Sequence, residues 1–150
     1  MDLMARELAV GRYGTGETKK AVMEKLEKLT RREEQLMRIF WERGPLFVRE
    51  LVEISGEPKP HFNTLSTWVR LLEAKGYLGH ESFGNTYRYY PLITEAEFGR
   101  GSLSSIVGRY FKDSYLGAVS ALIEDEKISL DELRGLIRSI EEQNASDDNR

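Results

Sequence analysis

The chain has 150 residues and a net charge of −3, with 40% hydrophobic and 31% charged residues. This length holds one compact domain, or a small domain with a helical extension, and leaves little room for a two-domain enzyme. The composition is that of a folded globular protein and not of a disordered one. Because the chain has no cysteine, disulfides, thiolate catalysis and cysteine-based zinc or copper sites are excluded.

The sequence also predicts no metal, no cofactor and no membrane insertion. His61 and His80 are the only histidines, and they lack a third partner at metal-ligand spacing. No stretch approaches the ~20 apolar residues that span a bilayer, and Met1 to Val22 lacks the apolar core of a secretory signal. We therefore expect a cytoplasmic protein. Neither a glycine-rich phosphate loop nor a nucleophile with a base and an acid is recognisable, so the chain is not expected to be an enzyme.

The charge is unevenly divided along the chain. Residues 1–92 carry 15 Lys/Arg against 13 Asp/Glu, whereas residues 93–150 carry 7 against 12. Attraction to phosphates acts over about the Debye length, so a protein that is acidic as a whole can still bind DNA through one face.

The first 22 residues are polar and rich in glycine, which predicts a flexible N-terminal extension. In one interpretation they are an extension that precedes a natural start at Met23, and this interpretation is favoured. The alternative is a basic arm that contacts phosphates through Arg6, Arg12, Lys19 and Lys20.

Three helices are predicted next. Thr30 and Glu33 form a capping box, apolar residues then recur at helical spacing, and Gly44-Pro45 ends the run. A short second helix should bury Val48, Leu51 and Val52 before Gly56, Pro58 and Pro60 break it. The third helix, over residues 62–75, should pack through one face made of Phe62, Leu65, Trp68, Val69, Leu72 and Gly76. Its free face should hold Asn63, Ser66, Thr67, Arg70 and Ala74.

A β-hairpin is predicted after the third helix. Two short extended runs, 77–83 and 86–91, flank the turn dipeptide Gly84-Asn85. Three helices followed by a hairpin predict a mainly α fold, the winged helix-turn-helix, over residues 23–92.

Residues 93–150 are predicted to form a helical dimerisation region. Apolar residues recur at helical spacing over 103–123, in one long segment that loosens near Asp113 to Gly117. A second capping box, Ser129 and Glu132, begins a last helix, and the tail from Asn144 should fray. A second subunit is the simplest cover for these apolar faces, although the helices could instead fold back on their own domain. The predicted dimerisation residues are Leu103, Ile106, Val107, Tyr110, Phe111, Leu122, Leu133 and Ile137.

The free face of the third helix carries the groups that bind DNA. Amide, hydroxyl and guanidinium groups hydrogen-bond base edges and phosphates, so Arg70 is expected to contact guanine and Asn63 adenine. An ordinary solvated helix face is the alternative. In the hairpin, the residues expected to face DNA are His80, Asn85, Arg88 and Tyr90. Tyr87 and Tyr89 should alternate to the other side, in the core.

From Leu29 to about Glu142 the chain resembles the BlaI/MecI type of penicillinase and methicillin-resistance repressors. The resemblance rests on LTRREEQLMRIFWERG, HFNTLSTWVRLLEAKGYL, TYRYYPL and RYFKDSYLGAVSALIEDEKISLDEL, in this order. It implies a homodimeric winged-helix repressor, with intertwined C-terminal helices, bound to a palindromic operator in front of resistance genes. It places the base-reading positions at Asn63, Thr64, Ser66 and Thr67. Ser66 replaces an arginine of the methicillin repressor, which implies a different operator sequence.

The resemblance also implies a route of inactivation. In this family a membrane sensor with a metalloprotease domain detects β-lactam, and the repressor is then cut in its dimerisation helix between an Asn and a Phe. The corresponding junction here is Ser105 and Ile106, so both residues differ. Copper-responsive relatives use a C-terminal cysteine cluster, which this chain lacks, so copper sensing is excluded.

Two other functions stay open from the residues alone. A winged-helix protein–protein interaction module without sequence-specific DNA binding would use Trp68 or the tyrosines as exposed anchors. A ligand-gated repressor would hold an effector between its DNA-binding and dimerisation regions.

Overall fold

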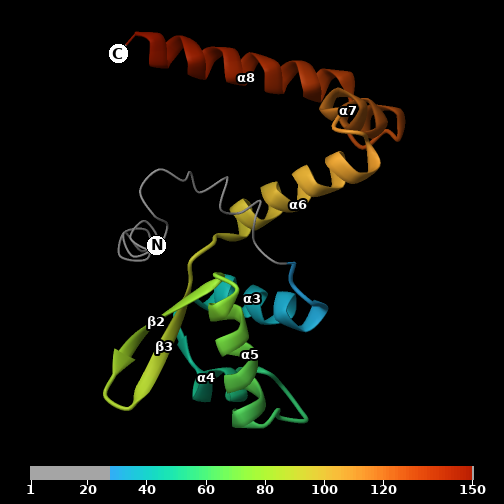
Figure 1. Ribbon diagram of the computed structural model, residues 1–150. Helices are drawn as coiled ribbons and strands as arrows, with labels where there is room; N and C mark the ends of the chain where they lie inside the picture. The colour runs from blue at the N-terminus through green and yellow to red at the C-terminus, as the bar shows by residue number, and fades with distance from the viewer. Residues whose placement is uncertain (1–27, 150) are drawn as a thin grey trace. The chain divides into compact units, whose positions relative to one another are not determined.

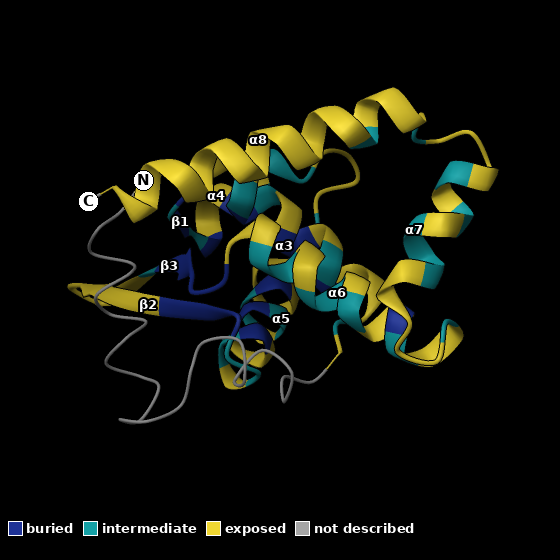
Figure 2. Ribbon diagram, turned by 90° about the horizontal axis from the view of Figure 1, so that it is seen from above, coloured by how far each residue is buried: buried dark blue, intermediate teal, exposed yellow. Residues whose placement is uncertain are grey.

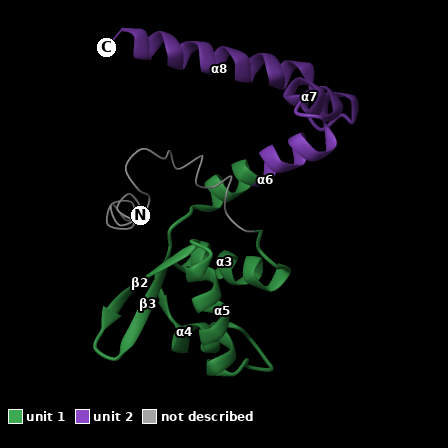
Figure 3. Cartoon of the chain, in the orientation of Figure 1, with its two compact units in different colours: residues 1–101 green, residues 102–150 purple. Residues whose placement is uncertain are grey.

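A computed structural model describes residues 28–149 of the chain (Figure 1). The extension predicted over residues 1–22, including its basic arm, lies outside the described residues. The chain divides into two compact units, residues 1–101 and 102–150 (Figure 3).

Unit 1 is a winged helix-turn-helix, as predicted. Its elements are α3 (Arg31–Arg43), β1 (Leu46–Phe47), α4 (Val48–Ile54), α5 (Phe62–Ala74), β2 (Leu78–Phe83) and β3 (Thr86–Pro91). Helix α5 packs against α4 on one side and β2 on another (Figure 1). The described part of the chain is thus mostly helical with a small antiparallel sheet.

Local sequence signals set the ends of α3. The Glu33 backbone nitrogen donates to Thr30 Oγ1 at 3.3 Å, and the Thr30 nitrogen donates to Glu33 Oε2 at 3.0 Å. This is the predicted capping box. Gly44 ends the helix with a φ of 79°, a backbone conformation that costs glycine little because it has no Cβ.

The sheet has one strand more than predicted. Its order is β1-β3-β2, all antiparallel, with Leu46 of β1 opposite Tyr89 of β3. The predicted turn at Gly84-Asn85 joins β2 to β3, so Phe83 lies opposite Thr86 and His80 opposite Tyr89. A two-residue strand shows no alternation of its own and forms only through this pairing.

The core of unit 1 lies between the three helices and the sheet. Phe40 and Met37 of α3 and Leu51 of α4 are fully buried, and Val48 of α4 is also buried. The other members of the cluster are Leu36, Leu46, Leu65, Val69, Leu72, Tyr77, Leu78, Tyr89 and Ile93. Burying one such side chain contributes about 1.5 to 3 kcal/mol, which fixes α5 against the rest of the unit.

The start of α6 (Glu95–Tyr110) belongs to unit 1. The Trp41 Nε1 donates to the carbonyl of Ile93 at 2.8 Å, and the rings of Trp41 and Phe98 lie 5.4 Å apart. Tyr77 contacts Phe98 edge-on at 6.2 Å. The first turn of α6 is therefore packed on the helix-turn-helix.

Unit 2 consists of the rest of α6, α7 (Tyr115–Glu124) and α8 (Leu130–Asp148). The predicted long segment is two helices, and the break falls where it was expected to loosen: Lys112 and Asp113 have positive φ. The Ser129–Glu132 capping box is confirmed. The tail from Asn144 was expected to fray, and in the structure α8 continues to Asp148. None of the described helices is long and apolar enough to cross a membrane.

Candidate nucleic-acid interface

Helix α5 presents one polar face to solvent. Leu65, Val69 and Leu72 are buried on the opposite face. At 100° per residue, Asn63, Thr67, Arg70 and Ala74 fall within a narrow arc, and all four are exposed. We call these four residues the reading face. Thr64 and Leu71 lie exposed on one flank, and the half-buried Ser66 lies on the other.

Hydrogen bonds to the helix backbone orient two side chains of the reading face. The Thr67 Oγ1 donates to the Asn63 carbonyl at 2.9 Å, and the Arg70 Nε donates to the Ser66 carbonyl at 3.2 Å. The Thr67 oxygen can still accept a hydrogen bond, and the terminal nitrogens of Arg70 can still donate. The reading face therefore offers an amide, a hydroxyl and a guanidinium on a helix, an element that the major groove of DNA is wide enough to admit.

One of the two aromatic residues of α5 differs from the prediction. Phe62 was expected on the packed face but is 53% exposed. It is the first residue of the helix and follows an exposed connection, so no neighbouring element covers it. Trp68 is half-buried, with the Arg32 guanidinium 5.3 Å from its ring. Trp68 is thus part of the packing and not a fully exposed anchor.

The hairpin β2–β3, here called the wing, places its side chains differently from the sequence-based expectation. His80 lies on the same face as Tyr87 and Tyr89, with ring centroids 4.3 and 5.8 Å away. Tyr89 is buried as predicted, but Tyr87 is 48% exposed and not in the core. Tyr90 was expected to face DNA and is buried instead. Its ring covers Gly79, where an added Cβ would meet it at 3.0 Å.

The side chains of Arg88 and Asn85 in the wing are both accessible to solvent. Asn85 is exposed in the turn, and the Arg88 side chain is 38% exposed. The Arg88 Nη2 lies 3.1 Å from Glu81 Oε2, and its guanidinium lies 4.7 Å from the Phe83 ring centroid. A phosphate contact of Arg88 would therefore have to compete with Glu81.

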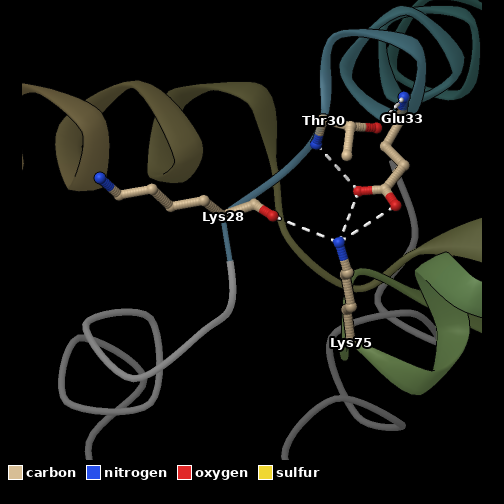
Figure 4. A network of polar contacts seen from close by, with 4 residues as sticks. All are labelled: Lys28, Thr30, Glu33 and Lys75. Atoms are coloured by element: carbon tan, nitrogen blue, oxygen red, sulfur yellow. Dashed lines mark hydrogen bonds and ion pairs between the residues drawn. The ribbon is translucent and has the colours of Figure 1, made fainter.

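A polar network fixes the C-terminal end of α5 to the start of α3 (Figure 4). The Lys75 Nζ lies 2.7 Å from Glu33 Oε2 and donates to the Lys28 carbonyl at 3.2 Å. Burial raises the pKa of the Glu33 carboxyl, but the hydrogen bonds and charge of Lys75 and the hydrogen bonds of Thr30 outweigh it, so the pKa is lowered. This is a structural ion pair. Its partners are 42 residues apart, so no local sequence pattern predicts it.

The C-terminal helices expose apolar side chains. Among the predicted dimerisation residues, Leu103, Ile106, Tyr110, Leu122 and Ile137 are between 43 and 68% exposed, and Phe111 and Leu133 are half-buried. Val107 is the exception, since it is the one buried residue among the described residues of unit 2. Ser105 and Ile106 are exposed within α6. Apart from the half-buried Leu133, every described residue of α8 is exposed (Figure 2).

The described residues contain no group of three or more His, Asp or Glu side chains that is arranged to hold a metal ion. A helical reading face, an adjacent wing and an extension with exposed apolar side chains are instead the parts of a DNA-binding protein.

Comparison with known proteins agrees with this architecture. The family model described as penicillinase repressor matches residues 29–142 of the chain. No curated protein matches the chain. The matched range takes in α3 to α5, the wing, α6, α7 and most of α8. The chain therefore belongs to the penicillinase repressor family and is a DNA-binding transcriptional repressor.

Proposed function

We propose that the chain binds a palindromic operator as a homodimer, with α5 in the major groove and the wing along the DNA backbone. The observation that carries the proposal is the reading face, where Asn63, Thr67 and Arg70 are exposed together. Base edges in the major groove present distinct patterns of donors and acceptors, which an amide and a guanidinium can distinguish. Dimerisation repeats the reading face about a twofold axis and so fits a palindrome.

The exposed apolar side chains of unit 2 support the dimer. Leu116 is 84% exposed and Leu136 57% exposed, in addition to the predicted dimerisation residues. In α8, Leu133, Leu136, Ile137 and Ile140 follow helical spacing along one side. Such a stripe is costly in water, and covering it with a second copy contributes about 1 to 2 kcal/mol per side chain. A protein-interaction module would use exposed aromatic side chains such as Tyr87, but family membership favours DNA.

A salt titration of binding to the DNA upstream of the chain's own gene tests the proposal. Phosphate contacts release counterions, so affinity should fall by about three orders of magnitude between about 50 and 200 mM salt. The affinity for a shuffled duplex should be about a thousandfold lower or more. Equal affinity for both duplexes, or no binding at the lowest salt, contradicts operator recognition.

Replacement of Arg70 separates base reading from phosphate attraction. Arg70→Ala should weaken operator binding by about 1 to 3 kcal/mol. Arg70→Lys keeps the charge but loses the two parallel hydrogen bonds of the guanidinium. It should therefore bind the operator nearly as weakly as Arg70→Ala does, and it should bind shuffled DNA as tightly as the wild type does. An Arg70→Lys variant that binds the operator like the wild type assigns Arg70 to phosphate and not to guanine.

For inactivation we propose control by β-lactam through a membrane sensor-protease pathway, with cleavage between Ser105 and Ile106. Both residues lie inside α6, at least four residues from either end of the helix. A protease binds extended backbone, so cleavage requires local opening of α6. Mass spectrometry of the protein from β-lactam-treated cells should find a fragment that ends at Ser105. Intact protein together with lost repression contradicts this route.

A further inference from the structure

A short contact between a carboxylate and an imidazole joins α5 to the wing. The His80 Nδ1 lies 2.5 Å from Glu73 Oε2, and the two side chains are 35% and 24% exposed. Glu73 lies in the last turn of α5 and His80 is the third residue of β2. The pair therefore holds the wing at a fixed place beside the reading face.

The groups that face His80 come from two elements. From α5 this is Glu73. Glu73 also acts on the neighbouring Tyr89, whose pKa is raised by burial and by Glu73, although Arg70 opposes the rise. From β3 they are Tyr87 and Tyr89, whose rings contact the imidazole. Glu81 and Arg88 pair with each other instead.

The net charge of the Glu73–His80 pair depends on the imidazole. With a neutral imidazole the pair carries one negative charge next to the reading face, and with a protonated imidazole it carries none. DNA phosphates repel the first form, and the effect is local because it acts over about a Debye length. Histidine is the side chain that changes charge between about pH 5 and pH 8.

We propose that His80 and Glu73 position the wing for DNA binding and that DNA binds preferentially to the protonated pair, so that affinity rises as the pH falls. The inference rests on the proposed DNA binding and adds to it a dependence of DNA affinity on pH. His80 acts here through Glu73, as a positioning residue.

Fluorescence anisotropy with a rhodamine-labelled upstream duplex, at about pH 6 and about pH 8 and constant ionic strength, tests the proposal. Wild-type affinity should be roughly fivefold higher at the lower pH. His80→Gln should bind equally at both pH values, because glutamine does not titrate. His80→Lys should also bind equally at both, because its charge is permanent.

Two further variants separate the alternatives. His61→Gln removes the chain's only other histidine, exposed before α5, and should keep the fivefold difference. Glu73→Gln removes the negative charge at every pH, whereas the His80 imidazole can still gain a proton, so this variant should bind more tightly than the wild type at about pH 8 and should keep a pH dependence. A Glu73→Gln affinity that equals the wild-type affinity at about pH 8 shows that the carboxylate does not act on the DNA and overturns the role of Glu73.

The outcomes also distinguish this proposal from the function on which it rests. Wild-type binding that is the same at both pH values, or a pH dependence that survives His80→Gln, overturns the coupling and leaves operator binding intact. Failure to bind the duplex at either pH overturns the proposed function itself.

Discussion

Glu33→Gln is expected to lower the free energy of unfolding of unit 1 by about 2 to 4 kcal/mol. Glutamine is compatible with the capping box at this position, so the variant leaves the start of α3 capped. It removes the carboxylate that neutralises Lys75, whose side chain is only 17% exposed. An ammonium without its partner in that environment is costly, and the end of α5 loses its tie to α3. Urea unfolding followed by circular dichroism measures the change.

A double-mutant cycle with Lys75→Met isolates the pair. The two single variants each leave one partner without the other, whereas the double variant leaves neither, so the coupling energy should be about 1 to 3 kcal/mol. Arg38→Met is the matched control, because the Arg38–Glu34 pair on the same helix is exposed on both sides. Exposed pairs contribute about 0 to 1 kcal/mol, so the control should be nearly neutral. A Glu33–Lys75 coupling no larger than the control value contradicts this interpretation.

The Glu33–Lys75 pair should also make the free energy of unfolding depend on pH. The pKa of Glu33 is lowered below its ordinary value of 4.5 in the folded protein. The contribution of the ionised carboxylate is therefore fully present above about pH 4.5 and is lost as the pH falls through the lowered folded pKa. The stability difference between wild type and Glu33→Gln should shrink on acidification below that value. A difference that grows on acidification has the wrong sign.

Ile137→Asp is expected to convert the proposed dimer to monomers at micromolar concentration. Ile137 lies in the middle of the apolar stripe of α8 and is 47% exposed in the single chain. Losing its burial costs about 2 kcal/mol per subunit, and a twofold interface contains the change twice, so the dissociation constant should rise about a thousandfold. Sedimentation equilibrium measures the change. Operator affinity should fall with it, because the half-sites are then bound independently.

Gly135→Asp is the matched control for the dimer interface. It adds the same charge two residues away, on the other side of α8, and a Cβ at Gly135 meets no atom within 4 Å. This variant should remain a dimer. If Gly135→Asp dissociates the dimer as strongly as Ile137→Asp, or if Ile137→Asp stays dimeric, the apolar stripe is not the interface.

Local signals in the sequence predicted the helices of unit 1 and the wing. Thr30, Gly44 and the turn at Gly84-Asn85 each act through the backbone within a few residues, so their effects can be derived without the rest of the fold. The buried residues Leu65, Val69 and Leu72 follow from helical periodicity in the same way. The reading face lies on the opposite side of α5 from these buried residues, so the same periodicity predicts that it is exposed.

Features that depend on distant contacts were missed. β1 exists because Leu46 and Phe47 pair with β3, more than 40 residues later. The Glu33–Lys75 pair requires α3 and α5 to be packed first. The alternation of the wing was assigned with His80 on the wrong side, although the two-residue turn fixes the register and places His80 opposite Tyr89. That error was avoidable, because residues directly opposite in an antiparallel pair share a face.

The reading face is tested most directly by measuring Asn63→Ala against wild type on operator duplexes in which each base pair is replaced in turn. Gln35→Ala, an exposed polar residue on α3, is the control. If α5 reads sequence, Asn63→Ala loses discrimination of about 1 to 3 kcal/mol at one base pair and keeps it at the others, while Gln35→Ala changes none. Discrimination by Asn63→Ala that equals wild type at every base pair, or a uniform loss on all duplexes, contradicts base reading by this helix.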